Sequence, residues 1–232
     1  MSTLRDLPLF ASPDALSADA PSEAPPARFP EASYHSCASF FEAYLAETAT
    51  AASSVEGTAL EQAAAILLDA YASGAAVFAC GNGGSAAIAN HLQCDHLKGV
   101  RTATDLSPRV ISLSSNVELL TAIANDIAYE DVFAYQLQSQ AGRGDVLIAI
   151  SSSGRSANIV RAIEWARDNG MHTIALTGFG GGDALKLADV AIHVEGSNYG
   201  IVEDLHQAAM HALAQYIRQS RMTAEAIVGT VF

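Results

Sequence analysis

The chain has 232 residues, half of them apolar, and a formal net charge of -13. That length suits one sizeable α/β domain with appendages, which buries its own core. The 12 lysine and arginine residues form no run, which excludes a nucleic-acid surface because such a surface needs clustered cations, whereas backbone amides and hydroxyls can still hold a small phosphorylated ligand.

Residues 1–32 have the composition of a disordered N-terminal arm. Six of the seven prolines lie in the first 30 residues, mixed with alanine, serine and acidic residues in no sustained period. After this arm we expect a single domain over residues 33–222, with no second domain and no internal repeat, followed by a C-terminal tail over residues 223–232.

Two helices are predicted before the first strand. Apolar residues recur at helical spacing over residues 34–53 and 58–71, and Ser73-Gly74 ends the second segment. We expect an antiparallel helical pair, which either caps the sheet or packs against the same pair in a sister chain.

The rest of the chain alternates between strands and helices. Short apolar runs rich in β-branched residues, typical of parallel strands buried on both faces, span 75–80, 109–114, 145–151, 172–177 and 190–195. Helical segments fill the gaps at 85–97, 117–140 (broken near Asn125-Asp126), 155–169 and 201–220, and 183–188 is long enough for one turn only. This order predicts a doubly wound, flavodoxin-like α/β fold with a five-stranded, mostly parallel sheet, whose ligands bind beyond the carboxyl ends of the strands.

The first strand ends in a glycine-rich turn, GNGGSA at residues 81–86. Its spacing formally satisfies the dinucleotide-binding fingerprint GxGxxA. However, the second strand ends in Ser114, Ser115 and Asn116 rather than in an acid for the ribose, and no Lys-Ser/Thr follows the turn as in a P-loop. We therefore expect no nucleotide cofactor, but an anion at this helix N-terminus, where free amides and the helix dipole favour negative charge.

A second such turn, SSSGRSAN, follows the third strand. One serine there could be a helix N-cap and nothing more. Four hydroxyls around one glycine, from Ser151, Ser152, Ser153 and Ser156, exceed what capping needs. The pattern predicts a neutral phosphate cradle made of hydroxyls and amides.

Two clusters carry groups suited to acid–base or metal chemistry. His91 and Asp95 lie four residues apart, hence on one face of the helix after the glycine turn. The late stretch GIVEDLHQAAMH offers two acids and two histidines: Glu203, Asp204, His206 and His211. A surface ion pair is the plain alternative for one such pair, but two clusters on helices that border the ligand edge favour a cation or substrate site.

These stretches together resemble the sugar isomerase (SIS) domain, and within it the phosphoheptose (sedoheptulose 7-phosphate) isomerases. The resemblance rests on CGNGGSAAIANH, TAIAND, AGRGDVLIAIS and ISSSGRSANIVRAIEWARDNGMHTIALTG, and it covers roughly residues 35–220 in order. It implies a homotetramer with active sites formed between subunits and a sugar phosphate held by the serine-rich turn. It also implies aldose–ketose isomerisation of sedoheptulose 7-phosphate to an aldoheptose 7-phosphate through an enediol(ate).

The family pattern also implies a metal set and an acid/base pair. Family members that bind zinc use a His, a Glu four residues later, a Gln, and a His eight residues after that Gln. The matching positions here are His91, Asp95, Glu203 and His211, which suit zinc or another divalent cation. Asp95 and His211 are the implied acid/base pair. The two turns and the family position in TAIAND give the expected substrate and phosphate contacts: Asn82, Gly83, Ser85, Asp126, Ser151, Ser152, Ser153 and Ser156.

The chain departs from the family pattern at several of these positions. Asp95 stands where the family has Glu, which shortens its reach to a substrate carbon by one methylene. Glu203 replaces Gln, and Gly99 and Gly200 replace an Arg and an Asp. These departures leave open an isomerase that acts on a different sugar phosphate.

The helical spacing of Glu203 and His211 raises a geometric difficulty. Eight residues are about 12 Å on a straight helix. One ion can therefore bind both only if the helix begins after Glu203, or if one of them serves a neighbouring subunit. His206 and His96 are nearby alternatives, and are otherwise histidines of a polar face or an interface.

A second open alternative is a non-catalytic SIS-domain protein that binds a phosphosugar and acts in regulation. The His91, Asp95 and His211 set argues against it, because an inactive scaffold has no need of these groups. The three cysteines are odd in number and lack CxxC spacing, which favours reduced thiols in the cytoplasm. The sequence shows neither a secretory signal nor an apolar run of bilayer length, so we expect no membrane partner.

Overall fold

The computed structural model describes residues 28–231. Residues 1–27 and Phe232 lie outside the described part, so the predicted arm over residues 1–32 falls almost wholly outside it. Among the helices of residues 28–231, none has both the length and the apolar character that a bilayer crossing requires.

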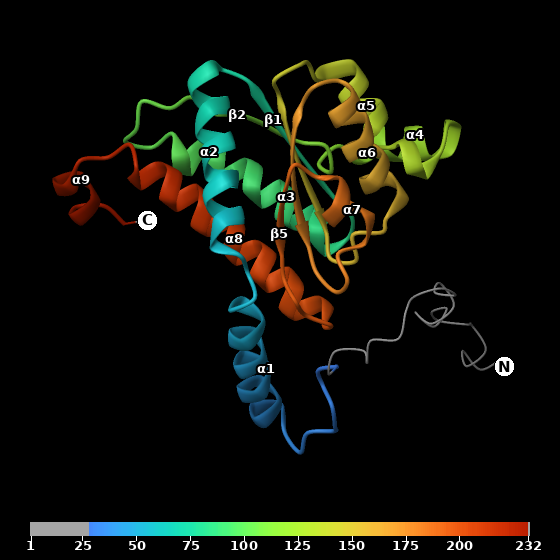
Figure 1. The fold of residues 1–232 in the computed structure, drawn as a ribbon, viewed down its shortest axis with the longest axis vertical. Helices are drawn as coiled ribbons and strands as arrows, with labels where there is room; N and C mark the ends of the chain where they lie inside the picture. The colour runs from blue at the N-terminus through green and yellow to red at the C-terminus, as the bar shows by residue number, and fades with distance from the viewer. Residues whose placement is uncertain (1–27, 232) are drawn as a thin grey trace.

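An all-parallel, five-stranded sheet forms the centre of the domain (Figure 1). Its strands are β1 (Ala76–Gly81), β2 (Arg109–Ser112), β3 (Val146–Ser151), β4 (His172–Thr177) and β5 (Val190–His193). They lie in the order β2-β1-β3-β4-β5, and every neighbouring pair is parallel. The predicted flavodoxin-like sheet is confirmed, and the strand order reverses between β1 and β3, where sheets of this kind bind their ligands.

Helices alternate with the strands as predicted. They are α1 (Cys37–Ala52), α2 (Gly57–Ser73), α3 (Gly84–Cys94), α4 (Val117–Asp126), α5 (Ala134–Gln140), α6 (Ala157–Asp168), α7 (Gly182–Leu187), α8 (Tyr199–Gln219) and α9 (Ala224–Val228). A π-helix, η2 (Asp95–Val100), continues α3, and a 3-10 turn, η3 (Tyr129–Asp131), separates α4 from α5. The predicted break near Asn125-Asp126 is confirmed, and the expected C-terminal tail contains α9.

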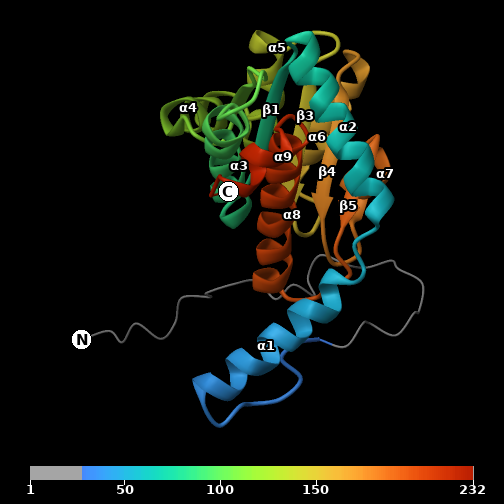
Figure 2. The same cartoon turned by 90° about the vertical axis from the view of Figure 1, so that its left-hand side faces the viewer.

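Each face of the sheet has its own core, because successive strand side chains point to opposite faces. On one face α2, α3 and α8 pack over Val77 and Ile148; Figure 2 views the molecule from the α2 and α8 side. On the other face α4, α5, α6 and α7 pack over Phe78 and Leu147. Coverage of both faces explains why the strands are continuous apolar runs.

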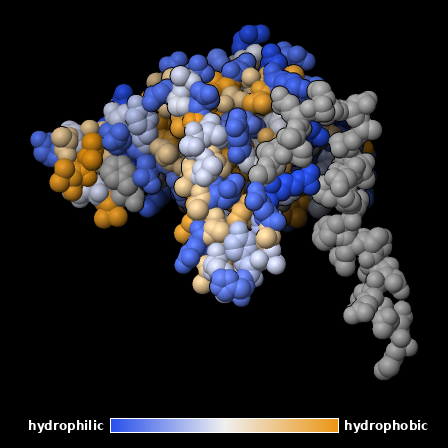
Figure 3. Space-filling model, turned by 60° about the horizontal axis from the view of Figure 1, so that its bottom comes forward, coloured by the Kyte–Doolittle hydropathy of each residue, from blue (hydrophilic) through white to orange (hydrophobic). Residues whose placement is uncertain are grey.

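The first two helices are present, but they do not form the expected antiparallel pair. The apolar side of α2, which includes the fully buried Leu67, packs on the sheet. α2 is therefore not available as an antiparallel packing partner for α1. α1 instead extends away from the sheet and contacts α8, where Tyr44 donates a 2.6 Å hydrogen bond to Asp204 (Figures 1 and 2). Phe41 and Leu45 remain 58% and 50% exposed. Figure 3, in which the bottom of Figure 1 comes forward, shows mixed hydrophilic and apolar surface on this side of the molecule.

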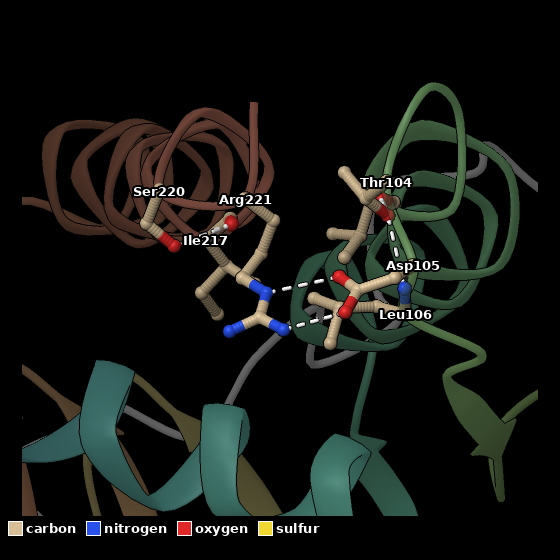
Figure 4. Close-up of polar contacts among 7 residues, drawn as sticks. Thr104, Asp105, Leu106, Ile217, Ser220 and Arg221 are labelled. Carbon is tan, nitrogen blue, oxygen red and sulfur yellow. Dashed lines mark hydrogen bonds and ion pairs between the residues drawn. The ribbon is translucent and has the colours of Figure 1, made fainter. Parts of the chain in front are cut away.

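An ion pair joins the loop before β2 to the end of α8. Arg221 donates from Nε and Nη2 to the two carboxylate oxygens of Asp105, at 3.0 and 2.6 Å (Figure 4). One turn earlier, Arg218 donates from Nε to the Thr102 carbonyl at 3.0 Å. Both contacts hold α8 beside the segment that carries η2, so these two elements keep a fixed relation.

Candidate active site

The serine-rich turn between β3 and α6 forms the wall of a small cavity. Gly154 adopts φ +64°, and a Cβ there would overlap the Gly181 carbonyl, so only glycine fits this turn. Ser156 stands at the N-cap of α6 without a capping hydrogen bond from its side chain. The Ser152 hydroxyl is buried and has no hydrogen-bond partner within residues 28–231. These hydroxyls are therefore not used for capping, which leaves them free for a ligand.

The cavity brings the serine-rich turn and the glycine turn together. Its volume is about 170 Å³, and its walls comprise Asn82, Ser85, Ile150, Ser151, Ser152, Ser153, Ser156, Tyr199 and Glu203. Asn82 and Asn158 exchange two side-chain hydrogen bonds at 2.8 and 2.9 Å, which fixes one turn against the other. Most of the predicted phosphate contacts therefore share one cavity.

Gly83 and Asp126 are not among the residues that line this cavity. Gly83 provides the positive φ of the glycine turn, at +55°. Asp126 is exposed and accepts a 2.7 Å hydrogen bond from the Asn125 side chain. A substrate contact for Asp126 stays a prediction.

Glu203 also lies at this cavity. Its carboxylate packs so closely on Gly84, at the start of α3, that a Cβ on Gly84 would overlap Oε2. Burial and then the neighbouring Asp204 raise the pKa of Glu203 above its ordinary value. A carboxylate therefore faces the N-terminus of α3, the position where the glycine turn alone predicts an anionic ligand.

A second group of side chains lies further along α3 and α8. The ligand atoms of His91, Asp95 and His211 all lie within 4.8 Å of one another. The Asp95 carboxylate is 3.3 Å from His91 Nε2 and 3.5 Å from His211 Nε2, and the two imidazole rings are 4.9 Å apart. These three predicted members of the metal and acid/base set are close together, and all three are accessible to solvent.

Glu203 does not join this group within one chain. α8 is a continuous helix from Tyr199 to Gln219, so Glu203 and His211 are separated by two turns, about 12 Å. The expected four-residue set is thus incomplete in a single chain, as the helical spacing requires. His96 and His206, the nearby alternatives, are both fully buried, and burial lowers the pKa of each to about 4.

Gln207 occupies the place beside the two histidines. Its side-chain amide nitrogen lies 2.9 Å from His211 Nε2 and 3.2 Å from His91 Nδ1. The sequence-based interpretation missed it, although Gln207 precedes His211 by four residues and so shares its helix face. Because the two ends of an amide are interchangeable in such a network, either its oxygen or its nitrogen can face the histidines.

Asp95 also lines a larger cavity. It has a volume of about 350 Å³ and includes two cationic residues: its walls comprise Asp95, Lys98, Gly99, Val100, Ala214, Gln215, Arg218 and Val231. The Asp95 carboxylate therefore borders space that a small polar molecule can enter.

Known proteins are similar to this chain over most of the described fold. The SIS domain matches residues 40–178. A phosphoheptose isomerase of Colwellia psychrerythraea is 38% identical over 174 residues, 74% of this chain and 88% of that protein. One from Mycobacterium tuberculosis is 39% identical over 167 residues, 69% of this chain and 83% of that protein. The structure of phosphoheptose isomerase GmhA from Neisseria gonorrhoeae has a TM-score of 0.73 at 32% identity, covering 79% of this chain and 100% of that one.

Proposed function

The chain belongs to the SIS domain family, and we propose that it is a phosphosugar isomerase that converts sedoheptulose 7-phosphate to an aldoheptose 7-phosphate. The observation that carries the proposal is the contact of the Asp95 carboxylate with two imidazoles in a domain that also holds a serine cradle. A protein that only binds phosphosugars needs the cradle but not this acid/base group.

The cradle suits a phosphate dianion without any cation. Among the described residues that line it, none is lysine or arginine. The free hydroxyls of Ser152 and Ser156 and the first amides of α6 supply the donors, and the helix dipole favours the negative charge. A phosphate would therefore give the buried Ser152 hydroxyl the partner that it lacks.

Asp95 and His211 are placed for the proton transfers. The Asp95 carboxylate takes a proton from C1 of the ketose while His211 protonates the C2 carbonyl oxygen, which gives the enediol. The proton then returns from Asp95 to C2, and His211 takes the proton of the C1 hydroxyl as the aldehyde forms. Asp95 Oδ2 and His211 Nε2 are 3.5 Å apart, so the two groups can reach C1 and the C2 carbonyl oxygen of one substrate molecule.

The same group fits a divalent cation. Two imidazoles and a carboxylate are ligands that zinc prefers, and their ligand atoms already lie within 4.8 Å of one another. A bound cation would polarise the carbonyl oxygen as a Lewis acid. We propose His91, Asp95 and His211 as ligands, with the Gln207 amide as the neighbouring oxygen donor.

We propose a homotetramer with shared sites, and the distances within one chain support sites that are completed by a neighbouring chain. Ser85 at the cradle and Asp95 are ten residues apart along α3, about 15 Å. In an extended heptulose 7-phosphate, the phosphorus lies about 10 Å from C1, because each of the eight bonds between them advances the chain by about 1.25 Å. A neighbouring chain would therefore complete each site, and the exposed Phe41 and Leu45 of α1 offer apolar surface for that assembly.

We place the enzyme in the cytoplasm. All three cysteines are free, and Cys37 and Cys94 are exposed. Exposed unpaired thiols persist in a reducing compartment, where phosphorylated sugars are also retained.

A different sugar phosphate is the second candidate, because the carboxylate of Glu203 stands where the family pattern has the amide of a glutamine. The Glu203 carboxylate lines the cradle wall beside the phosphate position. Such a group accepts hydrogen bonds from sugar hydroxyls but repels a second anionic group. A carboxylate, unlike an amide, donates no hydrogen bond, so Glu203 suits a different arrangement of sugar hydroxyls near the phosphate.

Turnover with a panel of ketose phosphates tests the proposal. The purified protein, with and without added zinc, is incubated with C5, C6 and C7 ketose phosphates, and aldose formation is measured. We expect the highest kcat/KM with sedoheptulose 7-phosphate. Binding of all these compounds without turnover would contradict the enzyme assignment, and a higher kcat/KM with a C5 or C6 compound would establish the second candidate.

A further inference from the structure

The helix that carries the acid/base group changes its winding at Asp95. α3 is an α-helix up to Cys94, and the next six residues, from Asp95 to Val100, form the π-helix η2. A π-turn within an α-helix is rare and is frequently found at functional sites. Here it begins at the residue that contacts both His91 and His211.

The wider turn keeps three side chains on the buried face. Leu92, His96 and Val100 recur every four residues, and each is at most 3% exposed. In a regular α-helix a four-residue step overshoots one turn by about 40°, so these side chains would drift around the helix. The π-helix winds less per residue and cancels this drift. Asp95 can then stay on the accessible side while its neighbour His96 points into the core.

A buried hydrogen bond fixes His96 in that position. The Tyr71 hydroxyl, from α2, is hydrogen-bonded to His96 Nδ1, and the two ring centroids are 5.8 Å apart. Both side chains lie in the interior of the domain, where His96 is 1% and Tyr71 5% exposed. The hydroxyl and the imidazole therefore satisfy each other's hydrogen-bonding capacity, and loss of either partner would leave a buried polar group unpaired.

We propose that Tyr71 and His96 are positioning residues, whose hydrogen bond holds the π-turn and thereby places the Asp95 carboxylate between His91 and His211. The inference rests on the proposed function of that group. Asp95 has a short side chain, so its reach depends on where the backbone places its Cα. The contacts at 3.3 and 3.5 Å leave little margin for a shift of the turn.

Cobalt(II) binding tests this role, because the visible bands of the ion report ligand geometry independently of turnover. The wild type is titrated with Co²⁺ beside His211→Ala, which must lose the site. Tyr71→Phe removes one hydroxyl and retains the packing of the ring. We expect about ten-fold weaker Co²⁺ binding and altered bands, the scale of loss seen when outer partners of metal ligands are removed. Ile88→Val is the control, because it thins the buried face of α3 without touching η2.

Variants of His96 and Asp95 separate positioning from stability. His96→Leu should behave as Tyr71→Phe does, whereas His96→Gln, which keeps an acceptor for Tyr71, should stay near the wild type. Glutamate has a longer side chain than aspartate. Addition of Asp95→Glu to Tyr71→Phe should therefore restore part of the Co²⁺ affinity that Tyr71→Phe loses. In isomerase assays the loss should fall on kcat and leave KM unchanged, because the cradle is distant.

Wild-type Co²⁺ affinity and bands in folded Tyr71→Phe and His96→Leu would overturn the proposal while leaving the proposed function intact. If the wild type itself bound no Co²⁺, the metal assignment would fail instead. The kinetics of Tyr71→Phe and His96→Leu would then test the positioning role, which predicts a lower kcat with an unchanged KM. A fall of kcat in Ile88→Val as large as in Tyr71→Phe would likewise overturn it.

Discussion

Gln207 and Glu203 lie one turn apart on α8, yet their side chains reach different parts of the molecule. Gln207 contacts His91 and His211, whereas Glu203 packs on Gly84 at the cradle. α8 therefore presents Gln207 to the two imidazoles and Glu203 to the serine cradle, four positions apart on one helix.

Gln207→Ala should weaken binding of a divalent cation about ten-fold, because it removes a donor beside the two imidazoles. Glu203→Gln, the matched variant one turn away, should leave cation binding unchanged and strengthen binding of inorganic phosphate. The gain, of the order of 1 kcal/mol or about five-fold, comes from removal of a negative charge beside the dianion. Isothermal titration with zinc and with phosphate measures both. Weaker cation binding in Glu203→Gln would instead place Glu203 in a neighbouring chain's metal site.

At the residue scale, the local spacing predicted contacts within one helix well. His91 and Asp95 meet because four residues bring side chains onto one face. Glu203 could not be placed in this way, because its partner depends on where α8 begins and on what packs against it. Gln207 was missed because an amide carries no charge or titration signal, although it shares the face of His211.

At the scale of elements, the two ligand turns depend on glycine where the backbone leaves no room for a side chain. Gly154 has φ +64° and lies against the Gly181 carbonyl, whereas Gly144, with φ +88°, has open space around it. A substitution by alanine at each position therefore separates two costs: the strain of a positive φ, which both share, and the steric overlap of a Cβ with Gly181, which only position 154 has.

Gly144→Ala should cost about 1 to 2 kcal/mol, the strain of a left-handed conformation alone. Gly154→Ala should cost more than that, because the turn must also shift away from Gly181, and it should lose phosphate binding. Urea unfolding and phosphate titration measure the two effects. Equal losses of stability with intact phosphate binding in both variants would show that the cradle tolerates a methyl group at position 154.

The strands were more predictable than the first helix pair. A parallel strand covered on both faces is apolar throughout, so all five runs were located within two residues at either end. The position of α1 depends instead on tertiary contacts such as Tyr44 with Asp204, which no local pattern encodes. The π-turn at Asp95 was likewise invisible in sequence, because the same residues predict an ordinary helix over 85–97.

At the scale of the whole molecule, the proposed homotetramer predicts that the cradle and the acid/base group of one site come from different chains. Ser152→Asp, which puts a charge into the cradle, and Asp95→Asn should each be inactive alone. Mixed oligomers that contain both variants should regain activity, because one chain supplies an intact cradle and its neighbour an intact Asp95. Tandem purification of differently tagged chains gives such oligomers. Inactivity of the mixture would mean that each chain holds a complete site.

The stability of the fold should depend on pH through two buried histidines. Burial lowers the pKa of His96 and His206 from 6.5 to about 4. The unfolded chain therefore binds protons that the folded chain does not, and the free energy of unfolding falls as the pH drops from about 6.5 towards 4. The slope is up to about 1.4 kcal/mol per pH unit for each histidine. Urea unfolding from about pH 7.5 to about pH 5 measures it; His206→Leu should reduce the slope, and constant stability over this range would contradict the assignment.

We propose that Asp95 transfers the proton in an isomerisation through an enediol, and incorporation of deuterium from the solvent reports this transfer at the carbon atom itself. In D₂O the wild type should convert sedoheptulose 7-phosphate to an aldoheptose 7-phosphate that carries deuterium at C2, because the accessible Asp95 exchanges its proton with solvent. Asp95→Asn should lower kcat by about 10² to 10⁴ while KM stays constant. Full turnover by Asp95→Asn, or an aldose product without deuterium at C2, would contradict the account.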